Sequence, residues 1–405
     1  MARKVLNFQD CSICADLNEL VKSALATHDK QQIADAKAKR VAHHLEQRNE
    51  RLSYYKNREA GRTGYTSSGK SCASLIFDKW DSAKTTVPFF VQPPGAWWSK
   101  LSHDALEQHV LGFLLHGIPN EAFLFTFNGA VKGDANSNIE GLRRVLLAKY
   151  PDAAHPMPQV LLLQADNASD NKNFAMLLFL AMLVYHGYTE EVFLSFLLVG
   201  HTHEDIDQLF SRLTRFLRDK FGNVYTPQDF QVAMQSALTS VPTIAAMMSS
   251  VLNWTKFLSP HLIKPAPLGI QHANFEVDGG IIDSDAQPAP DSQSEQSSTS
   301  TATKKKVKVM APHTFWIHKR ASDGEVVMHY KRLAASDVWY PPMDAHADDP
   351  VTDPRGIELF GTPPPDPMSQ PPEEVALFTA AVCQCTFDRC CGSHTWCTQA
   401  CTRQL

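Results

Sequence analysis

Two apolar runs in this sequence each stop abruptly at a cluster of carboxylates, amides and imidazoles, and a helix-like segment follows each cluster. The first run with its cluster is residues 160–173 (VLLLQADNASDNKN), and the second is residues 192–210 (VFLSFLLVGHTHEDIDQLF). A third run, residues 72–81 (CASLIFDKWD), ends in two aspartates. In an open α/β sheet, charged groups at the carboxyl ends of neighbouring strands build the binding site. The chain is therefore expected to form an α/β sheet with acids gathered along one edge.

The order of strand-like and helix-like patterns between residues 70 and 222 narrows the fold class. Strands are expected at 75–78, 109–116, 122–128, 160–164 and 193–199, and helices at 139–150, 174–186 and 206–221. Three successive strands followed by strands joined through helical crossovers are typical of the ribonuclease-H-like fold. We expect an α/β protein with a ribonuclease-H-like mixed sheet flanked by helices.

Composition divides the remainder of the chain. Residues 1–69 are expected to be a helical, basic segment, with eight Lys or Arg against three Glu between residues 37 and 62, and residues 70–265 the core with a helical extension. Residues 266–310 are an expected disordered linker with a basic run, and residues 311–342 a small β unit around the Asp323-Gly324 turn. Residues 343–405 are expected to be a Pro-rich linker and a Cys-rich tail.

Global properties limit where the protein works. The 405 residues carry a net charge of −5, so any basic surface for nucleic acid must be local. The N-terminus lacks an apolar signal core, and the longest apolar stretch, Phe174–Tyr185, is too short to span a bilayer. Lys305–Lys308 resembles a nuclear import signal. We expect an intracellular protein, nuclear or cytoplasmic, that is neither secreted nor bound to a membrane.

Three positions in the sequence resemble the acid sites of ribonuclease-H-like nucleases and transposases, which lie on the first strand, after the fourth strand and on the helix after the fifth. Asp78 and Asp166 occupy the first two positions, and Asp205 and Asp207 are equal candidates for the third. Two Mg²⁺ or Mn²⁺ ions about 4 Å apart need several converging carboxylates. We expect these four aspartates to be catalytic metal ligands, although each could instead cap a helix or close a turn.

Other polar side chains accompany these acids and are expected in a second shell around the metal or against a phosphate. Lysines neutralise phosphate charge, and amides and imidazoles hydrogen-bond to water or nucleotide. The residues expected in this role are Asp81, Lys84, Asn167, Asn171, Lys172, Asn173, His201, His203 and Glu204. The alternative role of the asparagine cluster is helix capping.

Zinc is the alternative metal. The His201-x-His203-x-Asp205 series resembles the zinc motif of metallo-β-lactamase-fold hydrolases, but Ile206 stands where that family has a further histidine. The Cys-rich tail is a second zinc candidate. Cys11-x-x-Cys14 supplies half of a zinc site, and His43 and His44, far along a predicted helix, are not expected to complete it.

Residues 8–342 together resemble an uncharacterised eukaryotic domain family of unknown function, whose members often look transposon-derived. The resemblance rests on LQADN-x3-NKN, on GHTHEDIDQLF and on the segment Phe77–Lys84, in which Lys79-Trp80 replaces the family's Gly-Met. It implies a transposase- or integrase-like nuclease that performs metal-dependent phosphodiester cleavage or strand transfer on DNA. The alternatives are a catalytically inactive, domesticated module that binds nucleic acid or protein, and a zinc hydrolase. Homo-oligomerisation is left open.

Overall fold

The computed structural model describes residues 11–92, 95, 105–128, 131–197, 204–263, 270–271, 276–277, 312–331, 333–337, 339, 356–362, 366 and 368. The chain divides into two compact units. The first unit comprises residues 1–54, 167–201 and 261–364, and the second comprises residues 55–166, 202–260 and 365–405. Nine of the described strands belong to mixed β-sheet structure, five in the second unit and four in the first. Helices accompany the strands in both units, so the expected mixed α/β class is confirmed.

The second unit contains the strands that carry the predicted acids. Its strands are β1 (Cys72–Trp80), β2 (Gln108–His116), β3 (Glu121–Asn128), β4 (Val160–Ala165) and β6 (Thr243–Met247), in the order β4-β1-β2-β3-β6. Strands β1, β2 and β3 are antiparallel neighbours, whereas β4 runs parallel to β1 and β6 parallel to β3. This is the expected arrangement of three antiparallel strands joined by a parallel crossover strand.

Helices cover both faces of this sheet, which explains why its strands are apolar along their whole length. On one face, α4 (Ala135–Lys149) packs against β2, where Gly141 lies directly over Leu111 and Phe113. On the other face, α6 (Asp205–Phe216) packs against β2 through Ile206 and Phe210, which lie over Gly112. Neighbouring residues of a strand point to opposite faces. The alternation therefore places Asp78, the partner of Gly112, on the face that α6 covers.

Gly141→Ala is expected to lower the free energy of unfolding by about 1–2 kcal/mol. A Cβ at this position would lie 2.6 Å from Leu111 Cδ2 and 2.8 Å from Phe113 Cε2, so side chains in the core would have to move. Overpacking of this kind costs roughly 1–3 kcal/mol, and the better helix propensity of alanine offsets part of it. Denaturant unfolding measures the change. Gly133→Ala is the control, since its Cβ would meet nothing closer than Lys79 Nζ at 3.7 Å; equal effects at the two positions would contradict the packing argument.

The remaining helices of the second unit are α7 (Pro227–Ala237) and the short α8 (Trp254–Leu258). Trp254 of α8 is fully buried, and its indole nitrogen donates to Glu140 of α4 at 3.2 Å. Two glutamines of α7, Gln231 and Gln235, donate their side-chain amides to the Ala245 carbonyl of β6, at 2.7 and 3.2 Å. Short turns lie at Ser82–Lys84 (η1) and Leu217–Phe221 (η3).

The first unit has four antiparallel strands in the order β11-β10-β9-β5. They are β5 (Glu191–Phe196), β9 (Thr314–Lys319), β10 (Val326–Lys331) and β11 (Ile357–Glu358). The β9–β10 hairpin confirms the one predicted around Asp323-Gly324, and Gly324 takes the positive φ (78°) that its turn requires. Helix α5 (Phe174–Tyr185), almost entirely buried, packs against β9. A separate two-stranded ladder joins β7 (Ile270–Gln271) and β8 (Glu276–Val277), and η4 is Ser259–His261.

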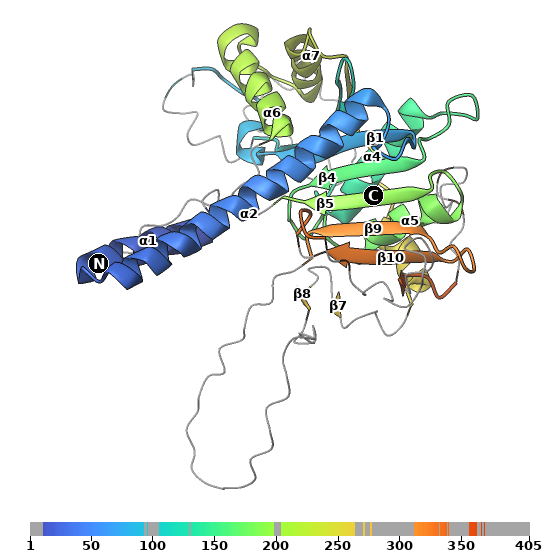
Figure 1. The fold of residues 1–405 in the computed structure, drawn as a ribbon. Coiled ribbons are helices and arrows are strands. Elements are labelled where there is room, and N and C mark those ends of the chain that lie inside the picture. The colour runs from blue at the N-terminus through green and yellow to red at the C-terminus, as the bar shows by residue number, and fades with distance from the viewer. Residues whose placement is uncertain are drawn as a thin grey trace, which may run out of the picture. The chain divides into compact units, whose positions relative to one another are not determined.

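Helices α1 (Ser12–Thr27) and α2 (Lys30–Thr63) form an antiparallel helical hairpin over residues 12–54 of the first unit (Figure 1). The hairpin turns at His28, which adopts the left-handed conformation with φ 54°. Glu50 of α2 is buried and accepts backbone N–H groups of Ala334 and Ala335 at 3.0 and 2.8 Å. Burial raises the pKa of this carboxyl, although the two backbone donors act in the opposite direction. The helical N-terminal segment is therefore as predicted for the described residues.

Some expectations require correction, and others concern segments outside the described residues. The helical extension expected at the end of the 70–265 core is not helical throughout, because Thr243–Met247 pairs with β3 as strand β6. The expected helix 206–221 changes to a wider π turn after Phe216. No helix among the described residues is both long and apolar enough to cross a membrane. The basic run 304–308 and the Cys-rich tail lie outside the described residues.

Candidate functional site

Asp78 and Asp166 come together at the carboxyl ends of two parallel strands. In the ladder between β1 and β4 the last pair is Phe77 and Ala165; Asp78 is the next residue of β1, and Asp166 directly follows the end of β4. Neighbouring strands lie about 5 Å apart, and paired residues of a parallel ladder point to the same face. Both side chains are half-buried. Two carboxylates at this spacing can share one divalent cation.

Asp205 occupies a different place. Its Oδ2 lies 3.1 Å from His116 Nε2 and 3.8 Å from a guanidinium nitrogen of Arg58. His116 pairs in the sheet with Ser74, four residues before Asp78 on β1, which corresponds to about 13 Å along the strand. The structure thus brings Asp78 and Asp166 together but places Asp205 toward the other end of β1.

Asp207 and Glu204 together start helix α6. The Glu204 side chain accepts the backbone N–H of Asp207, and the Asp207 carboxylate accepts the backbone N–H of Glu204 at 3.0 Å. This reciprocal capping box satisfies two backbone donors that the first turn of a helix otherwise leaves open. Of the two equal candidates for the third acid, Asp207 is therefore the one engaged in capping.

A hydrogen-bond series links Ser74, His116 and Asp205. Ser74 Oγ lies 2.9 Å from His116 Nδ1, and the other ring nitrogen faces Asp205. The connectivity is that of a Ser-His-Asp hydrolase. Ser74, however, is only 2% exposed, and a Cβ at Gly61 of α2 would lie 2.5 Å from the Ser74 Cβ. Since α2 covers Ser74, the series holds the His116 ring and the Asp205 carboxylate in place rather than presenting a nucleophile.

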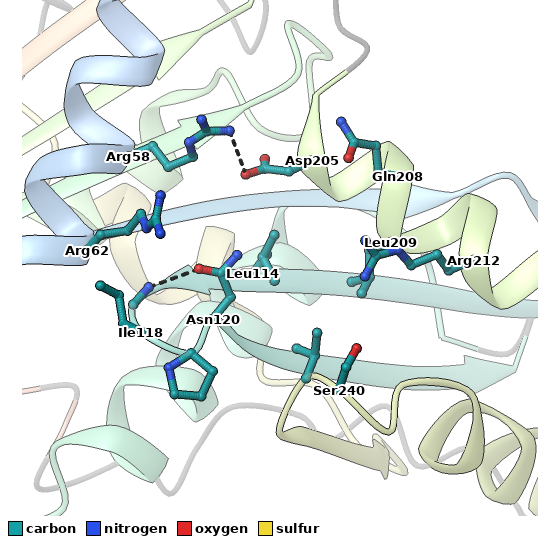
Figure 2. A pocket seen from close by; sticks show the side chains of 13 residues that line it. Arg58, Arg62, Leu114, Ile118, Asn120, Asp205, Gln208, Leu209, Arg212 and Ser240 are labelled. Atoms are coloured by element: carbon teal, nitrogen blue, oxygen red, sulfur yellow. Dashed lines mark hydrogen bonds and ion pairs between the residues drawn. The ribbon is translucent and has the colours of Figure 1, made fainter.

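Asp205 forms part of the wall of a basic pocket of about 480 Å³ in the second unit (Figure 2). Figure 2 shows Arg58 and Arg62 of α2 on one side and Gln208 and Arg212 of α6 on the other. The turn between β2 and β3 supplies a further polar side chain, Asn120, and Ser240 also lines the pocket. Three guanidinium groups and one carboxylate give the pocket an excess of positive charge. Arginine is the side chain best suited to bidentate contacts with phosphate.

The asparagine cluster after Asp166 is built into the first unit. Asn173 caps α5 by accepting the Met176 backbone N–H at 2.9 Å, so the capping alternative holds for this residue. Lys172 is 3% exposed, and its Nζ donates to Asn167 Oδ1 at 3.0 Å and lies 5.4 Å from the Phe196 ring centroid. Burial lowers the pKa of Lys172 to about 8. A phosphate contact through Lys172 would require this ammonium group to leave the interior; Asn171 is buried as well.

The remaining predicted residues are peripheral or lie outside the described part. Asp81 and Lys84 form an exposed ion pair at 3.3 Å beside Asp78 in the sequence. His201 and His203 lie outside the described residues, so their proposed zinc site stays a prediction. Within the described part of the chain, one group of three potential metal ligands converges to within 4.8 Å, and it consists of Cys11, Cys14 and His43. The expectation that His43 would not reach the cysteine pair is wrong.

Sequence reasoning missed the pocket. The basic character of residues 37–62 was a signal for Arg58 and Arg62, but nothing local indicated that Arg212 and Asn120 would join them. His116 ends an apolar strand and gave no signal of its pairing with Asp205, which lies 89 residues away.

Comparison with known proteins agrees with the resemblance over part of the chain. Residues 99–277 match the model of a family described as a domain of unknown function (DUF7869). The match includes β2, β3, β4, β5 and α6, and it begins after Asp78. Neither a curated protein nor a solved structure matches the chain. The expected similarity to an uncharacterised domain family is confirmed for this segment.

Proposed function

We propose that this protein is a transposon-derived nuclease of the transposase or integrase type, which cleaves or joins phosphodiester bonds of DNA. The observation that carries the proposal is the β1–β4 register, which sets Asp78 and Asp166 side by side at the carboxyl ends of parallel strands. The three antiparallel strands β1, β2 and β3, followed by β4 parallel to β1, support it as well.

In this proposal Asp78 and Asp166 hold Mg²⁺ or Mn²⁺ through carboxylate oxygens, the ligands that these hard cations prefer. Such an ion, when bound, supplies a Lewis acid for the attacking and leaving oxygens of a phosphodiester. The residues of the basic pocket have a separate task. Arg58, Arg62 and Arg212 bind backbone phosphates and hold the strand against the face of the sheet on which Asp78 lies.

The second candidate is a catalytically inactive module that binds nucleic acid. The observation favouring it is that both candidates for the third acid have other roles: Asp205 pairs with His116 and Arg58, and Asp207 caps α6. Both candidates use the basic pocket and predict DNA binding that weakens as salt is raised. Only the first predicts metal-dependent cleavage.

The test is cleavage of end-labelled DNA by the full chain with Mg²⁺, Mn²⁺, Zn²⁺ or EDTA, beside Mn²⁺ binding and DNA retention in a gel. Cleavage with Mg²⁺ or Mn²⁺ that EDTA abolishes is the expected result. DNA retention without cleavage or Mn²⁺ binding would overturn the nuclease proposal in favour of the binding module. Cleavage with Zn²⁺ alone, lost on His201→Ala and His203→Ala, would replace it with the zinc hydrolase.

A further inference from the structure

The two cysteines at the start of α1 and a histidine of α2 converge at one point of the helical hairpin. Cys11 is the N-cap of α1, and Cys14 lies in its first turn. Their Sγ atoms and a ring nitrogen of His43 all lie within 4.8 Å of one another. Cys11 and His43 are buried and Cys14 is half-buried. Three side chains that can each donate an electron pair thus face one small volume shielded from solvent.

The geometry and chemistry of this group suit zinc. Zn–S bonds are about 2.3 Å and Zn–N bonds about 2.0–2.1 Å, so sulfur and nitrogen ligands of one tetrahedral site lie about 3.6 Å apart. The distance from Cys11 Sγ to His43 Nε2 is 3.4 Å. Thiolate and imidazole favour Zn²⁺ over the hard cations expected at Asp78 and Asp166.

The surroundings of His43 fit a metal ligand as well. Its second ring nitrogen, Nδ1, lies 4.0 Å from a carboxylate oxygen of Glu46, one turn further along α2. A carboxylate that hydrogen-bonds the second nitrogen of a ligating imidazole orients the ring and raises its basicity, and the half-exposed Glu46 side chain lies near enough to take this role by a change of rotamer. The other ring nitrogen of His43, Nε2, contacts the side-chain amide of Gln47, and the same amide nitrogen donates to Cys14 Sγ.

The spacing of these residues follows a known ligand pattern with one substitution. Cys11-x2-Cys14 and His43-x3-Gln47 reproduce the C-x2-C and H-x3-H spacings of Cys2His2 zinc sites, with glutamine in place of the last histidine. Three protein ligands therefore leave a fourth coordination position beside Gln47, for its amide oxygen or for a water molecule.

We propose that Cys11, Cys14 and His43 bind one structural zinc ion that joins the start of α1 to the middle of α2. One apolar cluster between these helices consists of Val21, Ala24 and Ala36, with the partly buried Ile33 packed against it. A metal cross-link would add to the stability of this hairpin, because zinc binding contributes directly to folding.

The test is the zinc content of the full chain in a background that removes the competing thiols of the tail. In this background, serine replaces Cys383, Cys385, Cys390, Cys391, Cys397 and Cys401. The expected metal content is about one zinc per chain by inductively coupled plasma mass spectrometry. The cobalt-substituted protein is expected to show thiolate-to-metal charge-transfer absorption and tetrahedral d–d bands. Cys14→Ser and His43→Ala are expected to lose the metal, whereas Cys72→Ser and His44→Ala, the matched controls, keep it.

Two further variants separate metal binding from a general loss of structure. His43→Cys keeps a ligand and is expected to retain zinc, with cobalt charge-transfer absorption rising as the thiolates increase from two to three. Gln47→His completes the four-ligand set and is expected to tighten zinc binding at least about tenfold, since second-shell changes alone alter affinity about 10–100-fold. A folded chain without zinc, a Cys11–Cys14 disulfide in place of zinc, or zinc that survives both Cys14→Ser and His43→Ala would overturn the proposal.

Discussion

Asp166→Asn is expected to lower the rate of Mg²⁺-dependent DNA cleavage at least about 100-fold while leaving the fold unchanged. Loss of a second-shell partner of a metal already costs about 10–100-fold, and Asp166 is proposed as a direct ligand. Asparagine has the same shape and can still close the turn that follows β4, so a purely structural role of Asp166 would survive the substitution. Single-turnover cleavage and Mn²⁺ titration of the purified variant measure the effect.

The companion variant and the control sharpen this test. Asp78→Asn is expected to behave like Asp166→Asn, because its side chain can still accept the Lys79 backbone N–H that Asp78 Oδ1 accepts at 2.7 Å. Asp152→Asn is the matched control. Asp152 accepts backbone N–H groups in a turn that precedes β4, whereas Asp166 follows β4. Undiminished cleavage by Asp166→Asn would remove that residue from the active site.

Lys172→Met is expected to raise the free energy of unfolding by about 2 kcal/mol at pH 7. The pKa of Lys172, lowered by burial to about 8, lies well below the ordinary value of 10.5. A tenfold change in a protonation equilibrium is about 1.4 kcal/mol, so charging this lysine in the fold is about 3 kcal/mol less favourable than in the unfolded chain. Losing the hydrogen bond to Asn167 offsets roughly 1 kcal/mol of the gain.

The pH dependence of this effect has a definite sign. Between about pH 8 and 10.5 the unfolded chain binds the proton of Lys172 while the folded chain has released it, so the stability of the wild type rises with pH through this window. The advantage of Lys172→Met is therefore greatest below pH 8 and shrinks toward pH 10.5. Urea unfolding at several pH values measures it, with Lys220→Met, at an exposed position, as the control expected to stay within about 0.5 kcal/mol. An equal advantage at pH 7 and pH 10.5 would contradict the argument.

Most helices and strands could be predicted because apolar periodicity and turn residues lie within the sequence of each element itself. The apolar run that became α5 and the hairpin at Asp323-Gly324 stand where expected. Strand β6 was not predicted, because the segment 243–247 is short and is recognisable as a strand only through its pairing with β3. That pairing joins residues about 120 positions apart, and no local periodicity reports it.

The candidate site could be predicted only where its signals lie within the local sequence. Asp78 and Asp166 follow apolar runs that form parallel neighbours, so their meeting was expected from strand ends alone. The convergence of His43 with Cys11 and Cys14 depends on how α1 folds back along α2, which the sequence does not state. The pairing of Asp205 with His116 depends likewise on where α6 lies over the sheet.

The two glutamines of α7 that hold the Ala245 carbonyl have a consequence for how copies of this protein meet. β6 ends the row of strands in the second unit, and the unpaired backbone groups of such a strand are a template for aggregation. Ala245 is the middle residue of β6, and its carbonyl is already taken by side chains of the same molecule. A strand from a second copy would have to displace both amides before it could extend the sheet. The two glutamines therefore oppose the pairing of β6 with a strand from a second copy of the protein.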